Sequence, residues 1–180
     1  MPYPLLTERL SIQPLALPDA DAFVSYRQDP DIARFQSWEP SYSKAQAIEL
    51  IASQSGVDLP SQGQWMQLAL HHRASGDLVG DLALHSLAEN LVGYEIGFTI
   101  SKKYQGQGFA KEAAQKLMSH LVLLGARKFV ASTDRRNTAS IKVLTALGFQ
   151  QQPLKSWTEE FKNELVAVDY FEATSPTTSG

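Results

Sequence analysis

The sequence predicts an α/β domain in which helices pack on a mixed sheet. Three observations lead to this prediction: a strand-rich stretch over residues 65–100, an alternation of helix and strand patterns over residues 110–171, and a total length of 180 residues. The first pattern is typical of an antiparallel meander, and the second of helices that return the chain to a sheet. A chain of this length has room for one domain with a substantial core.

The N-terminal part is predicted to contain one strand and two helices. Residues 10–15 have a strand pattern, and a short helix follows over residues 18–27, where Pro and Asp favour the first turn. Ser43 and Gln46 have the spacing of a capping box, in which each side chain bonds the backbone of the other residue. The second helix therefore starts after Ser43, and Gly56 ends it.

The middle of the chain is predicted to form three antiparallel strands. Clusters of turn residues separate them, and the strands and turns in chain order are residues 65–71, 75–77, 78–85, 88–90 and 92–100. Trp65 opens the first strand, and we expect it to belong to the core.

The C-terminal part alternates between the two kinds of element. Apolar residues repeat every three or four positions over residues 110–121, which is the clearest helix pattern, and Gly125 stops it. The following elements are a strand over 127–133, a helix over 138–147 that Asn137 caps and Gly148 stops, a strand that starts at Phe149, and a last strand over 165–171. Trp157 lies between these last two strands. We expect one domain over residues 1–173 and a disordered tail over 174–180.

Composition excludes several classes of protein. The chain has no Cys, so disulfides, thiolate metal sites and a Cys nucleophile are excluded. No apolar run is long enough to span a membrane, and the four His have no metal-ligand spacing. With 16 Lys and Arg against 19 Asp and Glu, the net charge of −3 gives no basic footprint for nucleic acid. We expect a cytoplasmic protein that binds no metal, nucleic acid or membrane, as a monomer or a homodimer.

The most informative segment is a glycine-rich loop at the start of the long helix. Gly106 and Gly108 allow the backbone to approach a ligand closely, and the first helical turn has unpaired N–H groups that favour an anion such as a pyrophosphate. Lys102, Lys103 and Lys111 add positive charge around it.

Other interpretations of this loop remain open. It could be a simple turn that joins a strand to a helix. It could also be a dinucleotide-binding loop, although Lys111 stands where the third glycine of GxGxxG would be, and Asp134 could then bind the ribose. The P-loop sequence GxxxxGK[ST] does not occur.

Several short motifs resemble one family. Residues 103–108 (KYQGQG) resemble the (Q/R)xxGx(G/A) loop of the GCN5-related N-acetyltransferases (GNAT), with Lys103 as a departure from the pattern. Residues 109–113 are similar to the RimJ/RimL-like branch, which acetylates ribosomal-protein N-termini. The other motifs that resemble this branch, in chain order, are TERL at 7–10, EIGF at 95–98, NTAS at 137–140 and LGF at 147–149. Together they span about residues 5–172.

The resemblance implies a fold and a cofactor. The fold would be a largely antiparallel central sheet, splayed at the cofactor site and flanked by about four helices. Acetyl-CoA would lie in the splayed opening, with Asn137 and Ser140 beside its thioester. Its pantetheine arm would pair with the backbone of Phe98, Thr99 and Ile100, and its pyrophosphate would bind the amides of Gln105, Gly106, Gln107, Gly108, Phe109 and Ala110.

Glu95 is the candidate general base. It shares one face of its strand with Gly93 and Gly97, so its carboxylate would stand in open space near the acceptor. A bulge in this strand, which the family usually has, would shift that register. Alternatively, Glu95 is a solvated strand residue or is paired with Arg9. In that case Glu8 or Asp81 would be the next candidate.

Other residues have candidate roles at the leaving group and the acceptor. Ser140, at position N3 of its helix, is the candidate acid for the departing thiolate, or an ordinary first-turn Ser. Phe35 and Trp38 lie in the connection that walls the acceptor site in the family, although they could simply pack under that loop.

We therefore expect an N-acetyltransferase that moves an acetyl group from acetyl-CoA to a primary amine. Without Cys, the amine would attack directly in a ternary complex. The acceptor would be a protein N-terminus or a small amine. The alternatives are an acyl-CoA-sensing module without turnover and a dinucleotide-binding oxidoreductase.

Overall fold

The computed structural model describes residues 3–87 and 93–174. The helices in this part of the chain are α1 (Ala20–Arg27), α2 (Pro30–Ala33), α3 (Lys44–Ser53), α4 (Phe109–Leu123) and α5 (Thr138–Ala146). The strands are β1 (Leu5–Leu6), β2 (Leu10–Pro14), β3 (Trp65–His72), β4 (Leu78–Ser86), β5 (Gly93–Ile100), β6 (Lys128–Asp134), β7 (Gln150–Gln151), β8 (Trp157–Phe161) and β9 (Glu164–Thr174).

The strands form one mixed sheet with the order β1-β2-β3-β4-β5-β6-β9-β7, and β8 pairs with β9. Neighbouring strands are antiparallel except β5 and β6, which are parallel. A doubly wound dinucleotide-binding fold has a largely parallel sheet. The strand directions therefore exclude the doubly wound fold on which the oxidoreductase alternative depended.

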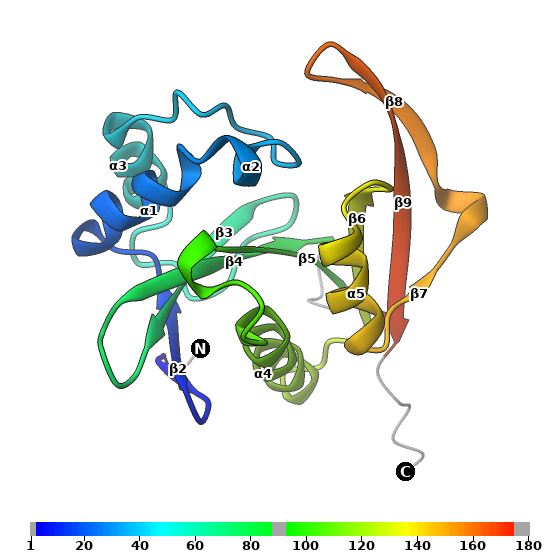
Figure 1. Ribbon diagram of the computed structural model, residues 1–180. Coiled ribbons are helices and arrows are strands. Elements are labelled where there is room, and N and C mark those ends of the chain that lie inside the picture. Colours follow the sequence, from blue (N-terminus) through cyan, green and yellow to red (C-terminus); the bar gives the residue numbers. More distant parts are fainter. Residues whose placement is uncertain (1–2, 88–92, 175–180) are drawn as a thin grey trace.

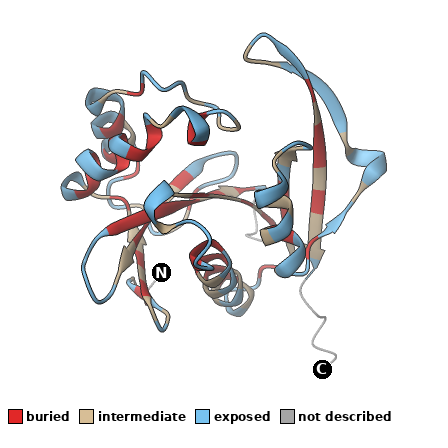
Figure 2. Cartoon of the chain, viewed as in Figure 1, coloured by how far each residue is buried: buried red, intermediate tan, exposed pale blue. Residues whose placement is uncertain are grey.

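Helices cover both faces of the sheet. Helices α1, α2 and α3 lie on one side, α4 lies on the other, and α5 packs beside α4 and β6 (Figure 1). The core is correspondingly divided. Leu68 and Leu82 pack towards Leu117 of α4, whereas Phe23 of α1 and Ala69 belong to a second cluster on the opposite face. Figure 2 shows buried residues on the central strands and on the part of α4 that lies next to the sheet.

Strands β5 and β6 separate part of the way along their length. Residues 93–95 of β5 pair with residues 128–130 of β6, and the parallel pairing ends there. Beyond that point β5 continues to pair with β4 as far as Ile100, and β6 continues to pair with β9 as far as Asp134. The sheet is therefore splayed next to the glycine-rich loop, which confirms the fold that the resemblance implied.

Most predicted elements are confirmed to within a few residues. The Ser43–Gln46 capping box is present in both directions, and the Asn137 side chain caps α5. The predicted turn at 88–90, the first residue of the strand expected at 92–100, and residues 175–180 of the expected tail lie outside the described residues. Thr174 is the last residue of β9 rather than the first residue of a tail.

The described residues contain five helices, close to the expected number, and the short helix α2 begins at a Pro after the Asp29 cap. Two expectations need correction, and one conditional shift does not occur. Trp157 does not lie between strands but begins β8. Trp65 is not a core residue, since 48% of it is exposed. No bulge shifts the pairing of β5 with β4, which is continuous from Tyr94 to Ile100.

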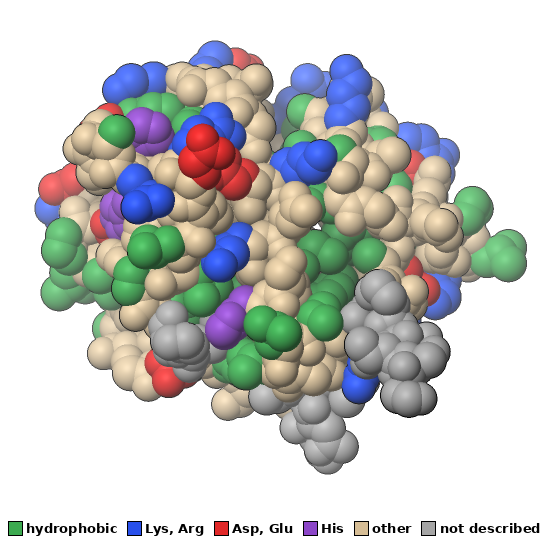
Figure 3. All heavy atoms as spheres, turned by 90° about the horizontal axis from the view of Figure 1, so that it is seen from below, with side chains coloured by type: hydrophobic (Ala, Val, Ile, Leu, Met, Phe, Trp, Pro, Cys, Tyr) green, Lys and Arg blue, Asp and Glu red, His purple; other side chains and the backbone are tan. Residues whose placement is uncertain are grey.

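The face seen from below carries hydrophobic side chains that gather in a hollow near its middle, with Lys and Arg side chains dispersed around them (Figure 3). None of the described helices combines the length and apolarity that a membrane crossing requires.

Candidate active site

A cavity of about 510 Å³ lies where β5 and β6 separate. Its walls come from α2, the last residues of β5, the loop before α4, and the first turn of α5. The residues predicted to bind cofactor or acceptor that line it are Phe35, Phe98, Thr99, Ile100, Gln105, Gly106, Gly108, Phe109, Ala110, Asn137 and Ser140. Residues far apart in the chain are thus brought to one cavity.

The loop at the cavity wall presents a series of free backbone amides. Gly106 and Gly108 have φ angles of +75° and +82°, in the left-handed region that favours glycine. The first intrahelical bond of α4 runs from the amide of Glu112 to Gly108, and the amides of residues 106–111 donate to no other described residue. An added side chain at Gly106 would meet open space. The loop therefore has both the room and the donors for an anion.

The charges around this loop differ from those expected. Lys102 pairs with Asp31 at 2.6 Å, and Lys103 lies 3.7 Å from Asp77, so both cations have acidic partners. Lys111 and Lys142 line the cavity and make no ion pair with a described residue. These two lysines are the better candidates to balance the charge of a bound anion.

Arg9, in the turn between β1 and β2, anchors the loop on the face of the sheet that α4 covers. Its Nη1 donates to the carbonyl of Gln107 at 3.0 Å, and its guanidinium lies 4.4 Å from the centre of the Phe109 ring. Its Nε donates to Glu112 at 2.7 Å, and Thr7 Oγ1 donates to the same carboxylate at 2.5 Å. Arg9 therefore does not pair with Glu95, and Gln107 contributes its backbone to this anchor instead of lining the cavity.

The anchor also affects the ionisation of Glu112. Partial burial raises its pKa, but the hydrogen bonds from Thr7 and Arg9 outweigh that effect and leave the pKa below its ordinary value. The carboxylate is therefore held ionised at the start of α4, where negative charge is also favourable to the helix. The TERL motif indicated a strand but gave no sign of this role. The sequence signal for this role was the spacing of Thr7 and Arg9, which brings both side chains to the Glu112 carboxylate.

The first turn of α5 forms the opposite wall of the cavity. The Asn137 side chain accepts from the amide of Ser140 at 3.2 Å, which confirms the predicted cap. The Ser140 hydroxyl makes no hydrogen bond with a described residue, and both residues line the cavity. The hydroxyl is therefore available to a ligand.

Glu95 lies beside the point where β5 and β6 separate, outside the lining of the cavity. The continuous register keeps it on the sheet face that α1–α3 cover, opposite the face of Tyr94 and Ile96. Its Oε1 accepts from Ser132 at 3.2 Å, and its Oε2 lies 3.4 Å from His85 Nδ1. The side chain is 25% exposed. Glu95 is thus a partnered carboxylate on the side of the sheet that α1–α3 cover.

The two other candidate carboxylates lie elsewhere. Glu8 is exposed at the turn between β1 and β2. Asp81 is buried beneath α1, where it accepts from Tyr26 at 2.5 Å and lies 3.7 Å from Arg27. Burial raises the pKa of Asp81. Neither residue lines the cavity.

The two aromatic residues of the α2–α3 connection differ in orientation. Phe35 lines the cavity, whereas Trp38 packs on the buried Arg27 at 3.6 Å and donates to its carbonyl at 3.1 Å. Lys162, at the tip of the β8–β9 hairpin, donates to the carbonyls of Ala33 and Trp38 at 2.8 and 2.6 Å. The tip of the β8–β9 hairpin is therefore hydrogen-bonded to α2 and to the α2–α3 connection.

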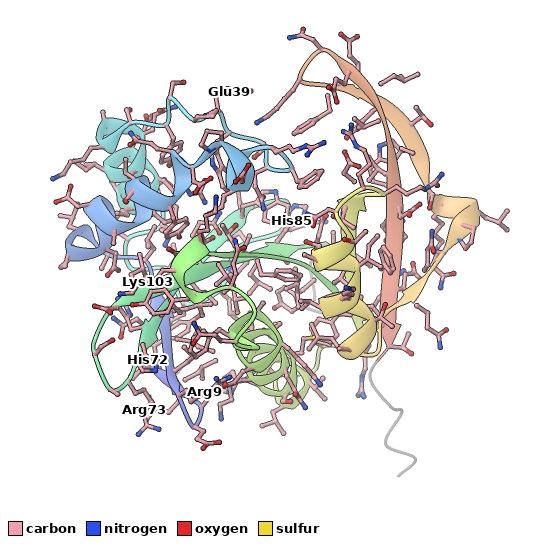
Figure 4. The ribbon with its side chains drawn as sticks, viewed as in Figure 1. Arg9, Glu39, His72, Arg73, His85 and Lys103 are labelled. Atoms are coloured by element: carbon pink, nitrogen blue, oxygen red, sulfur yellow. The ribbon has the colours of Figure 1, made fainter. Side chains whose placement is uncertain are left out.

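A row of side chains that sequence reasoning missed crosses the side of the sheet that α1–α3 cover. The Trp65 ring stacks on the His85 ring, with centroids 4.7 Å apart and planes 11° apart. Figure 4 shows His85 on the side of the sheet that faces α2, away from Arg9 and the other labelled residues near α4. Only the register of the strands could have indicated this row, since Trp65 pairs with His85 across β3 and β4, and His85 pairs with Glu95 across β4 and β5. In the described part of the chain no group of His, Asp and Glu could hold a metal ion.

Comparison with known proteins agrees with this geometry. Residues 9–150 match the model of the acetyltransferase (GNAT) domain family. A protein of Bacillus licheniformis, described as an uncharacterized N-acetyltransferase, is 30% identical over 168 residues, covering 93% of each chain.

Solved structures share the fold. Spermidine N-acetyltransferase from Vibrio cholerae, in complex with CoA and spermine, has a TM-score of 0.78 at 16% identity, covering 93% of this chain and 96% of that one. RimL, a ribosomal alpha-N-protein acetyltransferase in complex with coenzyme A, has a TM-score of 0.76 at 16% identity, covering 93% and 95%. From the matched family model, the relative and the splayed sheet, we conclude that this chain belongs to the GNAT family of acetyltransferases.

Proposed function

We propose that the protein transfers the acetyl group of acetyl-CoA to a primary amine by direct attack in a ternary complex. The observation that carries this proposal is the cavity itself, which joins the free amides of the loop to the separated edge of β5 and to the first turn of α5.

The donor would bind mainly to backbone groups. The pyrophosphate fits the amides of residues 106–110, with Lys111 and Lys142 close by. Residues 98–100 pair with β4 on one side and have no β6 partner on the other. An extended pantetheine arm could complete their hydrogen bonding in the way that an added strand does.

The leaving group would depart near α5. When the amine attacks the thioester carbonyl, the C–S bond breaks and the sulfur must receive a proton. Ser140 has a hydroxyl with no described partner on the cavity wall. We assign it to donate a hydrogen bond to the departing sulfur, with Asn137 fixing the turn that holds it.

The acceptor would approach from the face of α1–α3. Glu95 lies on that face at the point of separation, and we assign it to the group that deprotonates the amine. An α-amino group costs roughly 1 kcal/mol to deprotonate near neutral pH, against roughly 4 for a Lys side chain. The net charge of −3 suits a cationic acceptor.

The finer assignment follows the resemblance. Similarity to the RimJ/RimL-like branch favours a protein N-terminus in the cytoplasm, and the structural likeness to a spermidine acetyltransferase keeps small polyamines in the panel of acceptors. Phe35 would contact the acceptor from the α2–α3 connection, while Trp38 would support that connection from beneath.

The test measures two quantities on the same protein. Calorimetry with acetyl-CoA measures donor binding, and thiol release with N-terminal peptides and polyamines measures transfer. We expect binding together with amine-dependent release of CoA. Binding without release for any amine would identify a sensing module, and an absence of binding would overturn the proposal.

A further inference from the structure

The row across the acceptor face has an arrangement that Glu95 alone does not explain. Four adjacent strands contribute one residue each: Trp65 from β3, His85 from β4, Glu95 from β5 and Ser132 from β6. Ser132 lies beyond the last β5–β6 pair, so its contact with Glu95 bridges the two strands where they separate. The row therefore ends beside the opening in which the thioester would lie.

Both oxygens of Glu95 already have partners. Oε1 accepts from Ser132 at 3.2 Å, and Oε2 faces His85 Nδ1 at 3.4 Å. An ionised carboxylate can only accept hydrogen bonds, so in the neutral imidazole this contact favours the tautomer with the proton on Nδ1 and the lone pair on Nε2. Nε2 makes no hydrogen bond with a described residue, and the His85 side chain is 20% exposed. The free lone pair therefore belongs to His85.

The environment of His85 fixes its ring. The Trp65 indole stacks on it at 4.7 Å and covers one face, while Glu95 holds Nδ1. Among the described residues Glu95 is the one titratable group that pairs with the imidazole through a hydrogen bond or a close charge contact. β3 contributes an uncharged ring, and the α1–α3 layer contributes no ion pair to it. Imidazoles ordinarily titrate close to neutral pH and carboxylates far below it, so an imidazole is the better matched acceptor for an ammonium proton.

We infer that His85 Nε2 is the atom that accepts the proton of the acceptor amine, and that Glu95 is a positioning residue which orients the ring and stabilises its charged form. This inference rests on the proposed transfer to an amine. It changes the role of Glu95 from base to partner, and it gives the Trp65 stack the function of holding the ring plane.

The step balances without another reactant. The ammonium of the acceptor gives one proton to His85 Nε2, and the neutral amine attacks the thioester carbonyl carbon. The new C–N bond forms, the C–S bond breaks, and the second amine proton passes to the departing sulfur beside Ser140. The imidazolium then returns its proton to water, and the products are the amide and CoA thiol.

A second His–carboxylate pair in the same sheet provides a matched control. His71 Nε2 lies 2.7 Å from Asp19 Oδ1, and Asp19 also accepts from the amide of Ala16. Neither residue lines the cavity. His71 lies on the same face of the sheet as His85, but its partner Asp19 precedes α1 and not β5, so His71→Gln removes a similar contact away from the point where β5 and β6 separate.

The experiment compares His85→Gln, His71→Gln and Glu95→Gln with the unaltered chain, using two amines of different pKa and a range of pH. We expect His85→Gln to bind CoA normally and to lose about a hundredfold or more in kcat/KM. The loss should be larger for the amine of higher pKa, and the remaining rate should follow the fraction of free amine. Glu95→Gln should lose less, and His71→Gln should keep the pH profile.

The outcomes separate this inference from the proposed function. If the unaltered chain acetylates no amine, both are overturned. If it is active and His85→Gln keeps its rate and pH profile while Glu95→Gln loses both, Glu95 is the base and the inference about His85 is wrong. Normal CoA binding by each variant shows that a lost rate does not come from a lost fold.

Discussion

The two sides of the proposed site are built from different parts of the chain. On the α4 side, the groups that face the cavity are largely backbone amides from one contiguous segment, residues 105–110. On the α1–α3 side, the chemistry depends on single side chains from four strands, Trp65, His85, Glu95 and Ser132. Backbone donors recognise a feature shared by every CoA ester, whereas side chains can change with the acceptor. The difference therefore separates donor binding from acceptor chemistry.

The largest expected effect breaks the donor side without touching the acceptor side. Gly108→Val places a β-branched side chain at a φ of +82°, at the N-cap of α4. The loop would have to move, and several charge-assisted hydrogen bonds of about 1.5–3 kcal/mol each would be lost. We expect CoA affinity measured by calorimetry to fall about a hundredfold or more.

Gly76→Val is the matched control for this variant. Gly76 has a φ of +77° in the β3–β4 turn, and an added Cβ there meets nothing within 4 Å, whereas one at Gly108 would lie 3.7 Å from Arg9 Nη2, an ordinary van der Waals contact. The control should lower thermal stability and leave CoA affinity unchanged. Equal losses of affinity in the two variants would mean that strain alone, and not the anion loop, explains the effect.

The next largest effect concerns the first turn of α5, which lines the cavity between the donor side and the acceptor side. Ser140→Ala keeps the cap, because Asn137 accepts from the Ser140 amide and not from its hydroxyl. We expect kcat to fall about tenfold to a hundredfold with little change in KM, since the hydroxyl would act as the sulfur leaves. Thr145→Ala on the same helix is the control, and an unchanged kcat in Ser140→Ala would make Ser140 an ordinary first-turn residue.

The sequence predicted the donor side better than the acceptor side, because the donor side is built from one contiguous segment. The loop and the cap depend on local backbone conformation. Their positions could therefore be predicted from the spacing of Gly106, Gly108 and Asn137 in the sequence. The splayed sheet followed from the resemblance that these motifs carried.

The acceptor side depended on register and could not be predicted in the same way. The sequence predicts Trp65 in the core. This prediction was wrong, because a Trp at the start of a strand does not indicate which face of the sheet it occupies or what covers that face. His85 contacts Glu95 across two consecutive strands, whereas Ser132 contacts it from a strand 37 residues further along the chain. β8 was missed because most of its residues are polar and exposed, and its pairing with β9 defines it.

A smaller effect concerns the anchor under the donor loop. Arg9→Gln removes the bonds to the Gln107 carbonyl and to Glu112, both at a partly exposed site. Because exposed ion pairs contribute little and are screened by salt, we expect CoA affinity to fall only about fivefold. Calorimetry at low and high salt should show a larger difference between variant and unaltered chain at low salt.

The same anchor predicts a pH dependence of stability. The pKa of Glu112 is lower in the folded protein than its ordinary value. The stabilisation is therefore complete above the unfolded pKa and is lost as pH falls through the lower folded pKa. Melting temperatures should show the unaltered chain losing its advantage over Glu112→Gln in acid, below about pH 4. A constant difference across that range would contradict the assignment.

The smallest effect concerns Lys162, whose hydrogen bonds hold the α2–α3 connection to the β8–β9 hairpin on the proposed acceptor side. Lys162→Met removes the donor to the carbonyls of Ala33 and Trp38 while it keeps most of the side-chain length. We expect KM for the acceptor to rise only about threefold, because the two charge-assisted hydrogen bonds that are lost hold the α2–α3 connection and would not contact the acceptor itself. CoA affinity should not change. A change in CoA affinity with constant acceptor KM would place these hydrogen bonds on the donor side.

The central claim is that the diphosphate of CoA binds the amides at the start of α4. A crystal structure with bound CoA tests it most directly. The account predicts the diphosphate within hydrogen-bonding distance of the amides of residues 106–110, with the pantetheine arm along the open edge of residues 98–100. CoA bound elsewhere, with these amides unoccupied, would contradict it.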